Sequence, residues 1–187
     1  MGLFRQVFAA TAVLGLAALG GCATTADSPA SRADISNKSS LALNQLVRDN
    51  PAASAISKQS RAVLIFPSMV KAGLGFGGGF GEGELRQGGA TTGYYTSVTG
   101  SWGLQAGAQS YGYAVFLMND NAVQYLEDSD GWEIGVGPTV VVVNAGVAEN
   151  LSSSTLQDDA YAFIFDQKGL MAGVSIEGTK VSRVNTR

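Results

Sequence analysis

A run of glycines at every second position constrains the fold of this chain more than any other feature. The glycines concerned are Gly73, Gly75, Gly77, Gly79, Gly81 and Gly83, and between them stand Leu74, Phe76, Gly78, Phe80 and Glu82. Because successive residues of a strand point to opposite faces, one face of a strand here carries no side chains. Such a bare face permits another element, whether backbone, a helix or a ligand tail, to approach closely.

The same run contains the spelling G-x-G-x-x-G, which also occurs in dinucleotide-binding loops. Such a loop needs a strand before it, a helix directly after it and an acidic ribose partner downstream. Residues 85–89, Leu-Arg-Gln-Gly-Gly, have instead the composition of a turn. The sequence therefore favours a twisted or bulged strand over a nucleotide-binding loop.

The beginning of the chain has the pattern of a secretion signal. Residues 1–5 carry one positive charge, residues 7–19 are mostly apolar, and small residues precede Cys22. The apolar run is too short for a membrane span and fits a signal peptide over residues 1–21. A cysteine at this position is typical of bacterial lipoproteins, whose thiol carries diacylglycerol, and the alternative is an ordinary signal peptide with a stray cysteine. We expect a lipid on Cys22, and Ala23 in place of an aspartate favours the periplasmic face of the outer membrane.

The composition excludes several kinds of site. Cys22 is the only cysteine, and the chain contains no histidine. With Cys22 acylated, a disulfide framework, the common zinc sites and histidine-dependent catalytic triads are all unavailable. Residues 22–31 are small and polar and predict a tether, and residues 32–187 have the length of one domain.

Three helices are expected. The spacing of Ser31 and Asp34 is that of a capping box and predicts a helix from there to about residue 49. Pro51 predicts the first turn of a second, short helix. A third is expected over residues 120–128, with Asn119 or Asp120 as its cap.

Strands outnumber these helices. They are expected at 62–66, ended by Pro67, along the glycine run, at 92–100, 101–119 and 137–147, and as two strands within 160–178 joined by a tight turn at Asp166–Gly169. Consecutive strands joined by short turns pair antiparallel, and glycines within strands fit strong curvature. The sequence therefore predicts an α+β fold: a mainly antiparallel curved sheet or partly closed barrel, with the N-terminal helices packed against it.

Four runs between residues 62 and 178 occur in a characteristic order. They are AVLIFPSMVKAGLGFGGGFGEGEL, SWGLQAGAQSYGYAVFLMN, GVGPTVVVVNAG and AYAFIFDQKGLMAGVSIEG, and the most specific part is K-G-L-x-A-G-V-S-x-E-G, Lys168 to Gly178. Together they resemble the SYLF domain of bacterial lipoproteins and of eukaryotic lipid- and actin-associated adaptors. The resemblance implies lipid binding, which eukaryotic members achieve through basic and amphipathic N-terminal elements. It also implies no catalysis and no cofactor.

Charge is segregated along the chain. Six basic residues but only two acidic ones lie between residues 32 and 71, whereas residues 87–167 hold nine acidic residues and no basic one. One interpretation is a basic side that faces anionic headgroups, because each basic group near such a surface contributes about 1 kcal/mol. The other is that these residues are ordinary solvated helix faces. On the first interpretation the candidate headgroup contacts are Arg32, Lys38, Lys58, Arg61 and Lys71, with Lys71 favoured because it adjoins the glycine run.

Motifs of catalysis are incomplete. Ser68 and Lys71 spell S-x-x-K, but the S-D-N and K-T-G partners of that chemistry are missing. Ser175 lacks the second glycine of a G-x-S-x-G elbow, and the aspartate pairs 128/130 and 158/159 are flanked by turn and helix-start residues. We therefore expect neither an enzyme nor a metal site.

Two functions remain. The aromatic residues that alternate with glycines are candidates for an apolar slot for acyl chains, although each is equally a candidate core residue. The first hypothesis is a lipoprotein whose domain binds membrane phospholipid, preferring anionic headgroups, with no nucleic-acid partner. The alternative is an envelope scaffold that docks another protein or peptidoglycan through its acidic middle, Asp120 to Asp166.

Overall fold

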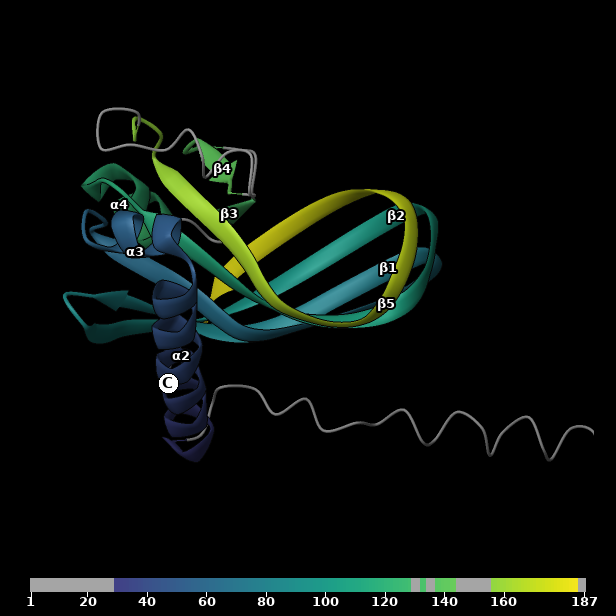
Figure 1. Cartoon of the computed structure of the whole chain (residues 1–187), viewed down its shortest axis with the longest axis horizontal. Helices are drawn as coiled ribbons and strands as arrows, with labels where there is room; N and C mark the ends of the chain where they lie inside the picture. Colours follow the sequence, from purple (N-terminus) through teal and green to yellow (C-terminus); the bar gives the residue numbers. More distant parts are fainter. Residues whose placement is uncertain (1–28, 129–131, 134–136, 144–155, 185–187) are drawn as a thin grey trace, which may run out of the picture.

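The computed structural model describes residues 29–128, 132–133, 137–143 and 156–184. Three long strands, β1 (Ala62–Gln87), β2 (Ala90–Leu117) and β5 (Ala160–Arg183), form most of a sheet in the order β1-β2-β5. The short strands β3 (Trp132–Glu133) and β4 (Val140–Val142) pair with β5, antiparallel and parallel respectively. All three long strands turn back at one end of the molecule, and the helices lie at the other (Figure 1).

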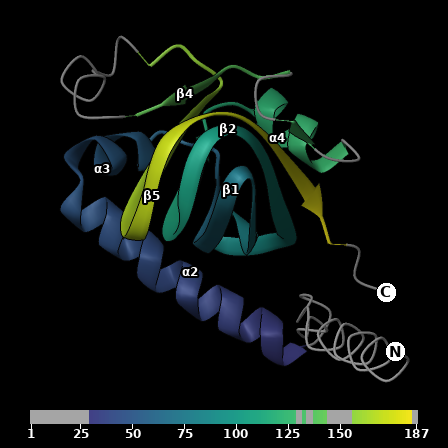
Figure 2. The same ribbon diagram turned by 90° about the vertical axis from the view of Figure 1, so that its right-hand side faces the viewer.

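The sheet is curled into a half-barrel. Viewed from the end where the strands turn, β1, β2 and β5 form nested arches, and α2 (Pro29–Asp49) passes beside them (Figure 2). This architecture confirms the predicted α+β fold, with a mostly antiparallel curved sheet and an N-terminal helix packed against it.

The helices follow the predictions except at the first N-terminus. Helix α2 begins at Pro29, so Ser31 lies inside it rather than at its cap, and residues 29–31 of the expected tether are helical. Helix α3 (Pro51–Ser57) is capped by Asn50, whose Oδ1 accepts from the Ala53 amide at 3.0 Å. No helix among the described residues combines the length and the apolar character needed to cross a membrane.

Helix α4 (Asp120–Asp128) begins where the sequence predicts. Of the two candidate caps it uses Asn119, whose Oδ1 accepts from the Ala122 amide at 2.9 Å. Its buried residues, Ala122, Val123 and Leu126, join the core on the concave side of the sheet.

The prediction that Pro67 ends the first strand is wrong, because β1 continues to Gln87. Proline has no amide hydrogen to donate, but β1 is an edge strand, where only one side of the backbone is paired. The register with β2 also shifts between Phe66 and Met69, which places Pro67 in a bulge. An edge position and a bulge are the two settings in which a strand accommodates proline.

The predicted turn at Asp166–Gly169 is a kink within one strand. Asp166 and Gly169 have φ values of +50° and +93°, which are typical of turns. The residues on both sides nevertheless pair antiparallel with β2, and the register shifts between Ser110 and Gly112. The local signal was therefore that of a β-bulge.

The strand expected at 137–147 is shorter in the structure. Its described part forms β4, Val140–Val142, which pairs in parallel with Ala160–Ala162 of β5. Residues 144–147 of that prediction lie outside the described part of the chain.

The core has two clusters, one on each face of the sheet at the helix end. The concave cluster includes Leu64, Phe66, Leu117, Leu126 and Trp132. The second cluster packs under α2 and α3 and includes Leu46, Ile56, Val63, Ile65 and Phe116. Because both faces of β1 are covered there, residues 62–66 are all buried, which explains their continuous apolar sequence.

Candidate functional site

The strands bend most sharply around Gly75 of β1 and Gly103 of β2. Gly75 has a φ of +74°, and the β1–β2 register shifts beside it, between Leu74 and Phe76. Inside the bend, Gln105 Nε2 lies 2.8 Å from Ser101 Oγ. Side chains four residues apart in a straight strand are about 13 Å apart, so this hydrogen bond requires a tight bend between them.

The glycine face of β1 packs against the first half of the same strand. A Cβ at Gly83 would overlap the carbonyl oxygen of Ile65, and a Cβ at Gly81 would overlap the side chain of Met69. At Gly79 the distance to the Val70 carbonyl oxygen would be 3.2 Å. The run is therefore a strand, and the element that approaches its bare face is the backbone of β1 itself.

The outer side of the bend exposes five large apolar side chains, which we call the apolar bend. Leu74, Phe76, Trp102, Leu104 and Leu170 are 82, 73, 63, 88 and 88% exposed. Phe76 and Trp102 pair across β1 and β2, and their rings stack with centroids 6.4 Å apart. Side chains on the outside of a tight bend diverge and cannot cover one another. Because soluble monomers seldom expose such a group, the apolar bend is a candidate interaction surface.

The segment around the apolar bend is free of charge. From Gly93 to Asn119, which includes nearly all of β2, the sequence has no acidic or basic residue. On β5, Asp166 and Lys168 form an ion pair of 3.0 Å close to Leu170, and Glu177 lies opposite Ser101. An uncharged apolar surface of this kind suits a hydrocarbon environment better than a polar protein partner.

The concave side next to the bend is polar and buried. It contains Ser97, Thr99, Ser101 and Gln105 of β2 together with Lys71 of β1. Burial lowers the pKa of the Lys71 ammonium group, because an ammonium ion loses hydration there. Lys71 is only 4% exposed, so the residue that sequence reasoning favoured for headgroup contact does not lie on the surface.

A groove of about 510 Å³ lies between α2 and β1. Its apolar lining includes Ile35 of α2, Val70, Ala72 and Phe80 of β1, and Val98 of β2. Asp34, Lys38, Ser68 and Glu82 add polar groups to its lining. The groove therefore combines an apolar wall with a few charged and hydroxyl groups, as sites for amphipathic molecules do.

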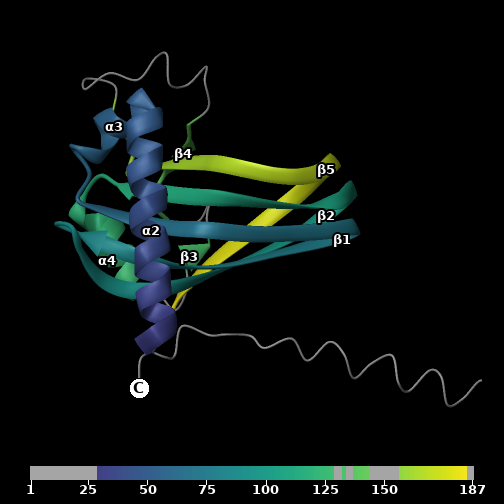
Figure 3. The same cartoon turned by 60° about the horizontal axis from the view of Figure 1, so that its bottom comes forward.

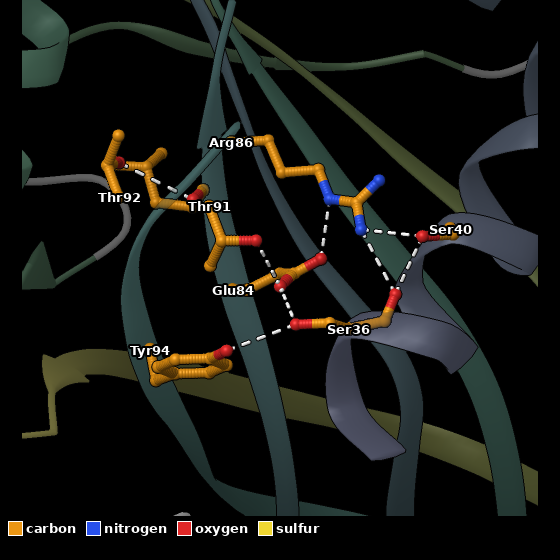
Figure 4. A network of polar contacts seen from close by, with 8 residues as sticks. Ser36, Ser40, Glu84, Arg86, Thr91, Thr92 and Tyr94 are labelled. Atoms are coloured by element: carbon orange, nitrogen blue, oxygen red, sulfur yellow. Dashed lines mark hydrogen bonds and ion pairs between the residues drawn. The ribbon is translucent and has the colours of Figure 1, made fainter. Parts of the chain in front are cut away.

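An internal ion pair fixes α2 to the hairpin formed by β1 and β2 (Figure 4). The Glu84 carboxylate is fully buried and accepts from Arg86 Nε, from Ser36 Oγ at 2.6 Å and from Thr91 Oγ1 at 2.8 Å. Arg86 Nη2 also donates to the Ser36 carbonyl oxygen at 3.0 Å and to Ser40 Oγ at 2.6 Å. These bonds satisfy both charges within the protein, so the network positions α2 rather than binding a ligand.

Arg32 belongs to the same contact region. Its guanidinium carbon lies 5.8 Å from the centre of the Tyr94 ring, and the Tyr94 hydroxyl lies 3.1 Å from Ser36 Oγ. A guanidinium over an aromatic face is attracted to the ring. Arg32 therefore takes part in packing α2 against the β1–β2 hairpin.

The other candidate headgroup residues are spread along α2 and α3. Lys38 Nζ pairs with Asp34 at 2.6 Å, and Arg61 lies 3.7 Å from Asp120. Lys58 is exposed at the C-cap of α3. The structure does not gather these residues at one point, although all of them except Lys71 remain at the surface.

The acidic middle is partly engaged in local contacts. Asp159 accepts from Asn119 Nδ2 at 2.8 Å, from the Thr139 amide at 2.9 Å and from Thr139 Oγ1 at 3.0 Å. The hydrogen bond from Asn119 is the largest cause that lowers the pKa of the Asp159 carboxyl group, and the bonds from Thr139 lower it further. Glu127 and Asp128 lie at the end of α4, and Asp130 lies outside the described residues.

The structure does not bring Ser68 and Lys71, the pair considered for catalysis, together on one face of β1. Ser68 is exposed whereas Lys71 is buried on the concave side. The Ser175 side chain lies outside the described part. Among the described residues, no three acidic or cysteine side chains are grouped so as to hold a metal ion.

Sequence reasoning missed the three exposed leucines of the apolar bend. A signal for them was present, because Leu74 and Leu104 occupy the face opposite the glycines and the inward polar residues. The aromatic residues divide between the core and the apolar bend. Tyr95, Trp132 and Phe163 belong to the core, whereas Phe76 and Trp102 are exposed at the bend.

Part of the chain is similar to a known protein family. Residues 98–186 match the family described as Ysc84, Las17-binding protein actin regulator. The matched segment includes Trp102, Leu104 and Leu170 of the apolar bend, and it begins after β1. No curated protein matches the chain.

Proposed function

We propose that the domain of this chain, whose residues 98–186 match the SYLF family, binds membrane phospholipid directly, as SYLF domains bind lipids. In this proposal the protein is a non-catalytic lipoprotein, attached through Cys22 to the periplasmic face of the outer membrane. The lipid on Cys22 holds the domain close to the bilayer, and the domain adds a second point of contact.

The apolar bend is the observation that carries this proposal. Transfer of one large apolar side chain from water into an apolar environment contributes about 1.5–3 kcal/mol. Five such side chains at one end of the molecule therefore supply a strong tendency to enter the hydrocarbon, even after the entropy lost when the domain is held at the membrane is subtracted. Trp102 and Phe76 are also residue types that favour the boundary between headgroups and acyl chains.

The two contacts reinforce each other. Diacylglycerol on Cys22 would supply two acyl chains, which suffice for stable attachment, so the domain makes its own contact from a lasting anchor. Because the anchor confines the domain near the surface, insertion of the apolar bend becomes an intramolecular step with a high effective concentration.

We further propose a preference for anionic headgroups. Lys38, Lys58 and Arg61 are exposed at their charged ends, and a basic group near an anionic surface contributes about 1 kcal/mol. Lys71 is not included, because its side chain is buried. The contribution of the three residues is electrostatic and is therefore expected to weaken as salt is added.

Co-sedimentation of the unlipidated domain, residues 26–187, with vesicles tests this function. Binding is expected with both neutral and anionic vesicles, more strongly with the anionic ones at low salt. The triple variant Lys38→Gln, Lys58→Gln, Arg61→Gln is expected to lose the anionic preference but not the binding itself. A domain that stays in the supernatant with every vesicle would contradict lipid binding and favour the alternative, docking of an envelope protein or peptidoglycan.

A further inference from the structure

The groove between α2 and β1 is continuous with the apolar bend. Alternate residues of a strand share one face, so three outward-facing rows lead from the groove to the bend. The rows are Val70-Ala72-Leu74 and Phe80-Gly78-Phe76 of β1, and Val98-Gly100-Trp102 of β2. The second and third rows are paired neighbours, because Phe80 lies opposite Val98, Gly78 opposite Gly100, and Phe76 opposite Trp102.

The three rows are apolar throughout. Val70, Phe80 and Val98 are 56, 48 and 53% exposed, so they form an open surface rather than a closed core. The rows contain no charged residue, and Asp34, Lys38 and Glu82 line the groove at the end near α2. An apolar path with charge at one end matches the distribution of polarity in a phospholipid.

We propose that the groove holds one acyl chain of a membrane phospholipid, with the headgroup phosphate beside Lys38. This proposal rests on the proposed function, because the lipid enters from the bilayer at the apolar bend. The volume of about 510 Å³ lies within the range of small-molecule sites, roughly 300–1,000 Å³. The apolar lining receives the hydrocarbon, and the ammonium group of Lys38 receives the phosphate.

The ion pair of Lys38 does not prevent this role. Lys38 and Asp34 have side chains that are 61 and 59% exposed, and an exposed pair of this kind contributes at most about 1 kcal/mol. A phosphate that approaches Lys38 therefore competes with a weak interaction. Figure 3 shows α2 lying across the strands at the end away from the bend, which places its charges at the far end of the apolar path.

Gly78 gives the groove part of its room. A Cβ at Gly78 would meet only the Thr99 carbonyl oxygen, at 3.7 Å, so a larger side chain fits there without strain and projects into the groove. Gly178 supplies a matched control. It lies on β5, outside the three rows and outside the lining of the groove, it is exposed, and a Cβ there would meet no atom within 4 Å.

Photo-crosslinking of the full chain in vesicles tests the site. The probe is phosphatidylglycerol with a diazirine in the middle of one acyl chain, and the labelled residues are identified by mass spectrometry. The wild-type protein is expected to be labelled both at the apolar bend and at groove residues such as Ala72 and Val98. Gly78→Leu is expected to lose the groove labels and keep those at the bend, whereas Gly178→Leu keeps both. Circular dichroism of each variant checks that it is folded.

The outcomes separate this inference from the proposed function. Labels at the bend but none in the groove of the wild-type protein would overturn the acyl site and leave membrane binding intact. Groove labels that persist in folded Gly78→Leu would also overturn it. If neither the bend nor the groove is labelled, the membrane-binding function itself fails. Lys38→Gln removes the ammonium group that receives the phosphate, so it is expected to reduce groove labelling by phosphatidylglycerol and by the same probe with a phosphatidylcholine headgroup, while the labels at the bend remain.

Discussion

At the scale of single residues, exposure distinguishes the leucines that we propose to enter the membrane from the leucines that hold the fold. Leu104 and Leu170 are each 88% exposed and contribute little to the core. We expect the double variant Leu104→Ser, Leu170→Ser to bind vesicles at least about tenfold more weakly, because each leucine that enters hydrocarbon contributes more than about 1.4 kcal/mol. Its free energy of unfolding should change by less than about 1 kcal/mol, since both side chains are already in water. Vesicle titration and urea unfolding measure the two effects.

Leu41 provides the control for this pair. It is 71% exposed but lies on α2, away from the apolar bend. Leu41→Ser removes a similar apolar side chain and should leave vesicle binding unchanged. Equal weakening by Leu41→Ser would show that general surface hydrophobicity, not the bend, drives binding.

Lys71 shows how far residue patterns alone lead. Because Lys71 adjoins the glycine run in the sequence, it was favoured for headgroup contact at the surface. Its position in the alternation of the strand indicates instead that its side chain is buried. Lys71 shares its face of β1 with Gly73 and Gly79, and that face turns inward when the strand curls. The phase of the alternation was therefore readable from the sequence, but the direction of the curl was not.

At the scale of elements, the buried ion pair between Glu84 and Arg86 determines how firmly α2 is held. Glu84→Gln removes one charge and leaves the Arg86 guanidinium, whose side chain is 17% exposed, without its counter-ion. We expect a loss of about 3 kcal/mol in the free energy of unfolding, because breaking a buried pair exposes the desolvation cost of the remaining charge. Urea unfolding measures it, with Asp34→Asn as a control that removes only an exposed pair and should cost below about 1 kcal/mol.

Asp159 connects three elements and makes their stability depend on pH. It joins Asn119 before α4 to Thr139 before β4, and it precedes β5. Because its pKa in the folded protein is lowered, the carboxylate stabilises the fold above the unfolded-state pKa of about 3.9. That contribution is lost as the pH falls through the lowered folded-state value.

We therefore expect Asp159→Asn to be less stable than the wild-type protein at pH 7, by a difference that shrinks below about pH 4. Urea unfolding of both proteins over this pH range measures the difference. Two stability curves that stay parallel from pH 7 to pH 3 would contradict the role assigned to the Asp159 carboxylate.

The ends of elements were predictable from the sequence where neighbouring residues determine them. They were less predictable where pairing with a distant strand determines whether a strand continues. The starts of α3 and α4 are fixed locally. Asn50 and Asn119 cap them with their side chains, and Pro51 has the dihedral preference of a first helical residue. Pro67 and Asp166–Gly169 carry equally strong local signals for an end and a turn, yet both lie within continuous strands. Pairing with β2 along their whole length outweighs these signals and converts each into a bulge.

At the scale of the whole molecule, one curl explains both the glycines and the apolar bend. The concave side is crowded by the two halves of β1, which only glycine permits, and the convex side spreads its side chains into solvent. The helices cover one end of the curl and leave the other uncovered (Figure 1). The polarity of the molecule thus follows its shape: the end covered by helices carries the charges of α2, and the other end exposes the apolar side chains of the bend.

Quenching of tryptophan fluorescence by brominated acyl chains tests insertion of the apolar bend most directly. The chain has two tryptophans, Trp102 at the bend, 63% exposed, and Trp132 in the core, fully buried. In vesicles that contain brominated phospholipid, the variant Trp132→Phe, which keeps only Trp102, should be strongly quenched. The variant Trp102→Phe, which keeps only Trp132, should retain its fluorescence. Unquenched Trp102 in protein that is bound to the vesicles would contradict insertion of the bend into the bilayer.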